Sequence, residues 1–78
     1  MASVKVYSTQ MCPYCVTLKE FLKANNIAFQ EIDVSMDQEA QKEMVEKSGQ
    51  MGVPVVEIDR EVIVGFDKER ISQILGIN

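Results

Sequence analysis

The residues best suited to chemistry are two cysteines within the segment TQMCPYC at residues 9–15. Cys12 and Cys15 are the only cysteines of the chain, which also has no histidine. On a helix, this spacing places two Cα atoms about 5 Å apart. That separation lies within the range a disulfide accepts. The pair can therefore form and reopen a disulfide without rebuilding the backbone.

The predicted position of Cys12, just before a helix, also favours its reactivity. Pro13 then falls at the first helical position, where a missing N–H costs nothing. The free N–H groups and the positive end of the helix dipole face the Cys12 sulfur. They favour the thiolate, which is the nucleophile. We therefore predict that Cys12 attacks a substrate disulfide and that Cys15 resolves the mixed disulfide.

Three other interpretations of the cysteine pair are less well supported. A structural disulfide would close only a four-residue loop and would remove little entropy from the unfolded chain. A structural zinc site needs four ligands, and a chain with one cysteine pair and no histidine supplies them only if chains share the metal. Two buried apolar cysteines are less typical of a pair at a strand-to-helix junction. The pattern favours redox chemistry, and no metal is expected.

Composition restricts the class of protein. The chain has 78 residues and is expected to form a single domain over residues 1–78. Its net charge of −4, from 8 basic and 12 acidic residues, argues against nucleic-acid binding, because the basic residues are also scattered. No apolar run approaches the ~20 residues that span a bilayer. Few cysteines and no secretory apolar segment at the start predict a cytoplasmic protein, expected to be a monomer.

Periodicity predicts seven elements in the order β-α-β-α-β-β-α. The helix that follows the cysteines has an apolar face with Cys15, Leu18 and Leu22, and Phe21 beside them. The predicted elements are a strand at 4–7, a helix at 13–24, a strand at 28–34, a helix at 38–47 capped by Ser35 or Asp37, strands at 55–58 and 61–64 joined by Asp59-Arg60, and a last helix after Asp67.

This order predicts an α/β fold. The first βαβ unit implies a parallel pair of strands. The closing hairpin adds antiparallel partners. A mixed four-stranded sheet flanked by three helices would bury every apolar stripe, including the one formed by Ala40, Met44 and Val45. This is the thioredoxin-like arrangement.

With CPYC after a short strand, VP before a hairpin and GFD before the last helix, the chain resembles the glutaredoxins along its full length. The resemblance implies a thioredoxin-like fold, a cis Pro54, Cys12 as attacking thiolate and Cys15 as resolving thiol. It also implies glutathione as electron donor, bound along the backbone at Val53 and near Asp67. The predicted substrate site comprises Tyr14, Val53, Pro54 and Asp67.

Several positions depart from the glutaredoxin pattern at the implied glutathione site. Thr9 stands where many glutaredoxins have lysine, and Gln50 where a basic residue is frequent. Gly52 replaces the usual threonine before Val-Pro, and Val64-Gly65 replaces paired glycines. The GVPVV stretch is similar to redoxins that take electrons from thioredoxin reductase, some of which serve ribonucleotide reductase. The electron donor therefore stays open between glutathione and thioredoxin reductase.

The sequence also leaves two further functions open. Resemblance to glutaredoxins allows a [2Fe–2S] carrier, in which Cys12 of two chains and two glutathiones hold the cluster, although the proline of CPYC does not favour it. A non-catalytic binding module that kept the fold is the other alternative. Disulfide-bearing proteins are the expected substrates. Met11, Tyr14, Met51 and Phe66 could form an apolar rim around the cysteines, and core packing is an equal alternative for Met51 and Phe66.

Overall fold

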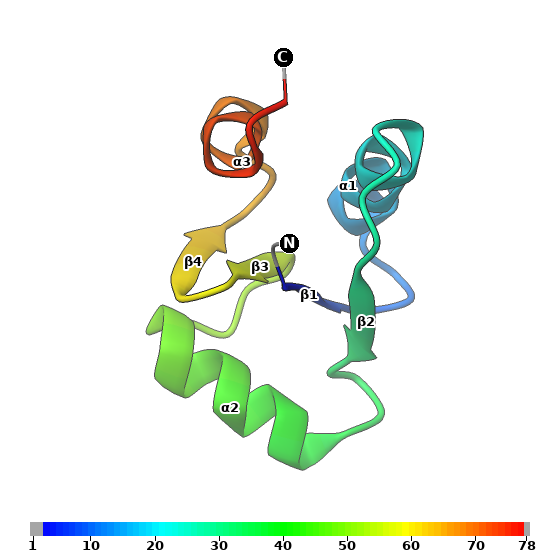
Figure 1. Ribbon diagram of the computed structural model, residues 1–78. Coiled ribbons are helices and arrows are strands. Elements are labelled where there is room, and N and C mark those ends of the chain that lie inside the picture. Colours follow the sequence, from blue (N-terminus) through cyan, green and yellow to red (C-terminus); the bar gives the residue numbers. More distant parts are fainter. Residues whose placement is uncertain (1–2, 78) are drawn as a thin grey trace.

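The computed structural model describes residues 3–77 and confirms the predicted order of elements (Figure 1). The second strand is shorter than the predicted 28–34, because its pairing with the first strand begins only at Gln30. Ala28 and Phe29 precede that pairing. The elements are β1 Val4–Ser8, α1 Pro13–Ala24, β2 Gln30–Asp33, α2 Gln38–Ser48, β3 Val55–Ile58, β4 Glu61–Val64 and α3 Lys68–Leu75.

The four strands form one mixed sheet in the order β2-β1-β3-β4. β1 pairs in parallel with β2, so that Tyr7 lies opposite Ile32. It pairs antiparallel with β3, where Tyr7 lies opposite Val55. β3 and β4 form the predicted hairpin, and Asp59 in its turn has a φ of 54°. β1 is therefore a central strand, held by hydrogen bonds along both edges.

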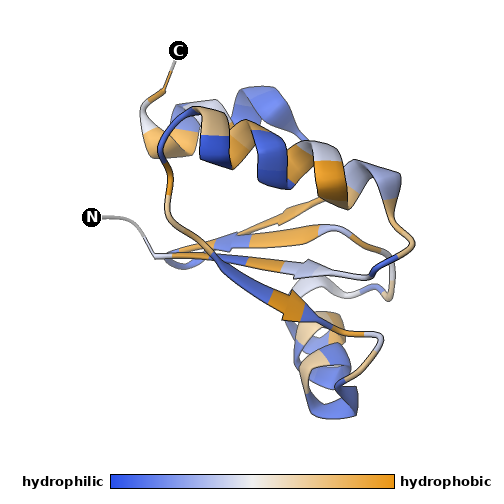
Figure 2. Ribbon diagram, turned by 90° about the vertical axis from the view of Figure 1, so that its right-hand side faces the viewer, coloured by the Kyte–Doolittle hydropathy of each residue, from blue (hydrophilic) through white to orange (hydrophobic). Residues whose placement is uncertain are grey.

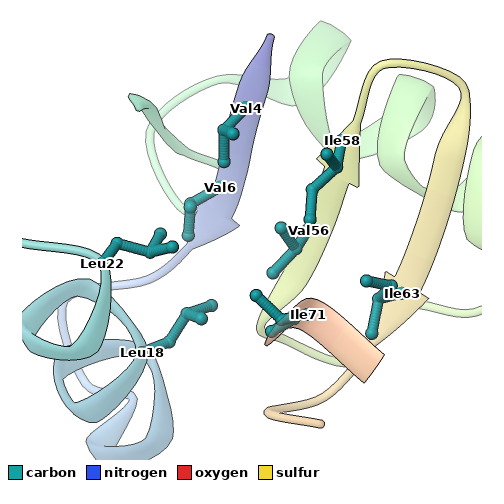
Figure 3. Close-up of a cluster of buried hydrophobic side chains, with 8 residues drawn as sticks. All are labelled: Val4, Val6, Leu18, Leu22, Val56, Ile58, Ile63 and Ile71. Atoms are coloured by element: carbon teal, nitrogen blue, oxygen red, sulfur yellow. The ribbon is translucent and has the colours of Figure 1, made fainter. Parts of the chain in front are cut away.

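Helices cover both faces of this sheet, with α1 and α3 on one face and α2 on the other (Figures 1 and 2). Successive side chains of a strand point to opposite faces. Val4 and Val6 accordingly join one core cluster and Tyr7 the other. The cluster against α1 and α3 is drawn in Figure 3 and comprises Val4, Val6, Leu18, Leu22, Val56, Ile58, Ile63 and Ile71.

The cluster on the opposite face packs α2 against the sheet. Its buried members are Tyr7, Val34, Ala40, Met44 and Val55. Asp37 caps the helix, since its Oδ1 accepts hydrogen bonds from the backbone N–H of Glu39 and Ala40 at 3.0 and 3.2 Å. The apolar stripe and the cap predicted from the sequence therefore act together to place α2.

A polar network also joins α2 to the sheet. The buried Tyr7 donates a hydrogen bond from Oη to Glu43 Oε1 at 3.1 Å. Lys47 Nζ donates to Glu43 Oε1 at 2.8 Å, to Glu57 Oε1 at 3.0 Å and to Tyr7 Oη at 3.4 Å. The network therefore connects α2 with β1 and β3. The hydrogen bonds from Lys47 and then Tyr7 lower the pKa of Glu43, while burial raises the pKa of Tyr7.

The network predicts a pH-dependent contribution to stability. When folding lowers the pKa of a carboxyl group, the group stabilises the folded protein at pH values above its pKa in the unfolded chain. This stabilisation is lost as the pH falls through the pKa of the group in the folded protein. Glu43→Gln should therefore reduce the free energy of unfolding at pH 7 by about 0.5 kcal/mol, since solvent reaches and screens the partly exposed pair of Glu43 and Lys47. The difference in stability between the wild type and Glu43→Gln should shrink as the pH falls below 4.5, the ordinary pKa of a glutamate. Urea denaturation at pH 7 and pH 3 measures both quantities.

Glu46→Gln is the matched control, because Glu46 is an exposed glutamate on the same helix. It should change stability much less than Glu43→Gln at pH 7. An equal loss for Glu43→Gln at both pH values would contradict an ionic role for this carboxylate.

Candidate active site

Cys12 is the N-cap residue of α1. Its backbone is extended, with φ −100° and ψ 109°, and Pro13 begins the helix. Cys12 Sγ accepts a hydrogen bond from the backbone N–H of Cys15 at 3.1 Å. The sulfur therefore lies where the first turn presents unpaired N–H groups, as the sequence predicts.

Cys12 and Cys15 are joined by a disulfide, with their Cα atoms 5.2 Å apart. This separation agrees with the spacing expected within one helical turn. Cys12 retains 9% of its surface exposed, whereas Cys15 is 0% exposed. Cys15 lies on the same helix face as Leu18 and Leu22, which are in the core. Cys12 thus keeps a small exposed area, while Cys15 is fully covered by the fold.

The electrostatics around Cys12 depend mainly on the helix. The nearest basic residues in the sequence, Lys5 and Lys19, are each seven positions away. The first turn of α1 contains no acidic residue that would oppose a negative charge on the sulfur. A thiolate at Cys12 is therefore stabilised chiefly by backbone N–H groups and the helix dipole.

The segment that leads into β3 has the geometry implied by the resemblance. The Val53–Pro54 peptide bond is cis, as expected. Because Tyr7 pairs with Val55, Pro54 and Val53 continue β3 toward the loop that carries Cys12. Pro54 is buried, and its carbonyl accepts a hydrogen bond from the N–H of Gly65 at 2.8 Å. Val53 packs against the core cluster under α2.

The two remaining predicted site residues lie at the surface. Tyr14 is 68% exposed on the first turn of α1. Asp67 is exposed and caps α3, with its Oδ1 accepting from the backbone N–H of Arg70 at 3.2 Å. Asp67 thus has a structural role as a helix cap, whether or not it also contacts a ligand.

Three of the four residues of the predicted apolar rim are exposed. Met11 is 90%, Tyr14 68% and Met51 64% exposed, and a rim formed by these side chains stays a prediction. Phe66 packs instead against the core cluster of Figure 3, with its ring centroid 5.7 Å from that of Phe21. Core packing is therefore the correct interpretation for Phe66, and surface exposure the correct one for Met51.

A cavity beside the active-site loop was not predicted from the sequence. It has a volume of about 270 Å³ and lies where β1 and β2 end, next to α1. The predicted parallel pairing of β1 and β2 could have indicated it, because the carboxyl ends of two parallel strands meet at one edge of a sheet. Its lining consists of Ser8, Thr9, Gln10, Val16, Lys19, Glu31 and Asp33.

Two further observations concern other classes of site. Among residues 3–77, no three histidine, cysteine, aspartate or glutamate side chains are grouped so that they could hold a metal ion. Over the same range, no helix combines the length and apolar character needed to cross a membrane.

Comparison with known proteins agrees with the fold and the cysteine geometry. The family model described as Glutaredoxin matches residues 4–63. A glutaredoxin-like 8.6 kDa protein from the rubredoxin operon of Clostridium pasteurianum, itself uncharacterised, is 44% identical over 72 residues, or 92% of this chain and 96% of that relative. Glutaredoxin 3 of Escherichia coli K12 is 36% identical over 67 residues, or 86% of this chain and 81% of that relative.

Solved structures show the same relationship. The crystal structure of a thioredoxin-like protein, determined as a point mutant, superposes with a TM-score of 0.92 at 41% identity and covers 100% of both chains. The glutaredoxin of Archaeoglobus fulgidus has a TM-score of 0.86 at 26% identity, over 96% of this chain and 87% of its own. The chain therefore has a thioredoxin-like fold and belongs to the glutaredoxin family.

Proposed function

We propose that this protein is a thiol–disulfide oxidoreductase that reduces protein disulfides and glutathione mixed disulfides. The observation that carries the proposal is the asymmetric cysteine pair, in which Cys12 caps α1 near the surface and Cys15 is fully buried behind it. Membership of the glutaredoxin family supports the same chemistry. The cytoplasm is the compartment we propose, and a monomer is the form we expect.

In the proposed cycle, the Cys12 thiolate attacks one sulfur of the substrate disulfide. A new bond forms between Cys12 and that sulfur, and the other substrate sulfur leaves as a thiolate. Cys15 then attacks Cys12 Sγ, which closes the internal disulfide and releases the second substrate thiol. The substrate gains two electrons and the protein loses two. Two molecules of glutathione, or the dithiol of a reductase, restore the reduced pair.

The residues around the cysteines have proposed roles in substrate binding. Val53 would offer backbone N–H and C=O groups to an extended substrate, and cis Pro54 would shape that surface. Tyr14 is exposed and can pack on apolar parts of a substrate. The carboxylate of Asp67 and the start of α3 would contact the γ-glutamyl end of glutathione. Glutathione is the donor we propose, and thioredoxin reductase is the alternative.

The cap geometry predicts different reactivity for the two reduced thiols. Cys12 should react with iodoacetamide about ten-fold faster than Cys15 at pH 7, because the helix N-terminus stabilises its thiolate. Reduction, brief alkylation and peptide mapping by mass spectrometry measure the two rates. The same experiment in urea is the control, since unfolding removes both the cap and the burial. Faster labelling of Cys15 in the native protein would overturn the assignment.

Serine substitutions test the order of attack and resolution. Cys12→Ser should abolish thiol–disulfide exchange, because the attacking sulfur is gone. Cys15→Ser should block the reduction of protein disulfides by the two-cysteine route and leave a mixed disulfide at Cys12 that can be trapped. Non-reducing electrophoresis and mass spectrometry detect that species. Equivalent behaviour of the two variants would show that the roles are wrong.

Thr9 and Gln50 affect how well glutathione is expected to serve as electron donor. Glutathione has two carboxylates, and cations matched to them stabilise binding by roughly 0.2–1 kcal/mol per exposed pair. Thr9 is half-buried beside the cavity, and Gln50 is exposed with its side chain close to Gly52. Neither supplies a positive charge. We infer that the wild type uses glutathione less efficiently than dithiol glutaredoxins with those cations.

Restoring the missing charges tests this inference. Thr9→Lys with Gln50→Arg should raise kcat/KM for glutathione about three- to thirty-fold. The gain should fall as salt increases, because exposed charges are screened. Gln38→Lys with Gln73→Arg adds the same charge at exposed sites on α2 and α3 and should give no comparable gain. An efficient wild type and no gain at low salt would mean that these cations do not set donor choice.

The alternative donor is tested with the wild type alone. Reduction by NADPH with glutathione and glutathione reductase is compared with reduction by NADPH and thioredoxin reductase. A higher kcat/KM in the second system would identify the protein as a redoxin of the thioredoxin reductase class. A higher value in the first would assign glutathione.

A further inference from the structure

The cavity beside the active-site loop lies on the opposite side of that loop from cis Pro54. In the sheet order, β2 and β3 flank β1 on its two edges. The cavity adjoins β2 through Glu31 and Asp33, whereas Val53 and Pro54 lead into β3. The loop between β1 and Cys12 lies between these two surfaces. An extended substrate that passes over Cys12 can therefore reach both.

The dimensions of the cavity suit one side chain. Its volume of about 270 Å³ is slightly below the range of about 300–1,000 Å³ typical of small-molecule pockets. Val16 is 47% exposed and forms part of the wall, together with Lys19. A long side chain can lay its methylene groups along such a wall while its polar end meets the remaining, polar lining.

The residues that line the cavity include more negative than positive groups. It contains one cation, Lys19, and two carboxylates, Glu31 and Asp33. Lys19 forms an ion pair with Glu31 Oε2, which also accepts a hydrogen bond from Ser8 Oγ at 3.4 Å. The ion pair compensates the charge of Glu31. Within residues 3–77, no lysine or arginine forms an ion pair with Asp33, so the cavity has a net negative charge at this carboxylate.

Asp33 is held in place by neutral donors. Its Oδ1 accepts hydrogen bonds from the backbone N–H of Ser35 at 2.9 Å and from Ser35 Oγ at 2.5 Å. These bonds fix the carboxylate at the end of β2. The Ser35 hydroxyl is also the main reason that the pKa of Asp33 lies below its ordinary value, so the group stays ionised at neutral pH. Both Ser35 bonds go to Oδ1. The side chain of Gln10, another neutral residue of the cavity lining, also contributes to the lowered pKa of this carboxylate.

We propose that this cavity is a specificity subsite that accepts a lysine or arginine side chain next to the reactive cysteine of a protein substrate, with Asp33 as its anionic partner. The proposal rests on the proposed thiol–disulfide exchange at Cys12. The expected preference is modest, because solvent screens an exposed ion pair. It should amount to about two- to five-fold in kcat/KM for a basic over a neutral residue.

The test uses a set of peptide disulfides that differ only beside the cysteine, where they have lysine, glutamine or glutamate. The wild type should prefer lysine over glutamine and disfavour glutamate. Asp33→Asn keeps the Oδ1 acceptor for Ser35 but removes the charge, so the ratio of lysine to glutamine should fall to about one. Lys19→Gln removes the competing cation and should raise the ratio. All preferences should weaken with salt.

The ratio of lysine to glutamine should thus fall in Asp33→Asn and rise in Lys19→Gln. This distinguishes recognition of the substrate from a structural role, since disruption of the fold would lower the ratio in both variants. Glu46→Gln removes a negative charge from α2, away from the cavity lining, and should leave the ratio unchanged. An unchanged ratio in Asp33→Asn, or a fall in Lys19→Gln, would overturn the proposal. So would a wild type that does not distinguish the peptides.

Reduction of 2-hydroxyethyl disulfide, which has no side chain that could enter the cavity, tests the proposed thiol–disulfide exchange separately from the proposed subsite. All three variants should retain the wild-type rate with it, which also shows that they fold. Normal reduction of this compound together with no peptide preference would refute the subsite alone. Failure of the wild type to reduce both this compound and the peptide disulfides would refute the proposed function.

Discussion

The hydrogen bond from the Cys15 N–H to Cys12 Sγ is the contact on which the site depends. It makes one sulfur the cap of a helix and fixes the second sulfur one turn later. An N-cap acceptor satisfies a backbone donor that would otherwise lack a partner. The same contact therefore begins α1 and favours negative charge on Cys12. Helix initiation and the proposed activation of the Cys12 thiol therefore depend on a single interaction.

That contact is effective only if α1 cannot move relative to the sheet. Leu18 and Leu22 are fully buried and pack with Val6 of the central strand (Figure 3). On the other face, Tyr7 joins the core under α2 and the network of Lys47. β1 is thus held on both faces and both edges. Since the active-site loop begins where β1 ends, the cysteines are attached to a strand that is constrained on all sides.

Electrostatics around the site come mainly from the backbone and from acidic side chains. Basic side chains are remote in sequence from Cys12, and Lys47 is engaged with Glu43 and Glu57. Lys19, the cation beside the cavity, is paired with Glu31. We therefore expect a partner that brings its own positive charge to fit this surface better than one that brings carboxylates. This expectation connects the proposed inefficiency with glutathione and the proposed preference for basic substrates.

Local sequence signals determined much of the fold. The spacing of Cys15, Leu18 and Leu22 predicted the buried face of α1, and Pro13 predicted its first residue, because both depend on helix geometry within one turn. Asp37, one of the two caps predicted for α2, begins that helix for a similarly local reason, and Gly49 ends it in a left-handed conformation. The cysteine pair and its place at the helix start were also evident, and the glutaredoxin motifs correctly implied the cis bond before Pro54.

Tertiary structure alone decided what depends on residues distant in the sequence. Periodicity could not show whether Met51 or Phe66 is buried, because their exposure is set by packing against other elements, such as Phe21 beside Phe66. The length of β2 followed from its register with β1. The cavity exists because parallel pairing brings the end of β2, with Asp33, beside the loop that leads to Cys12. Such proximity is a property of strand pairing, and no segment of the sequence contains it by itself.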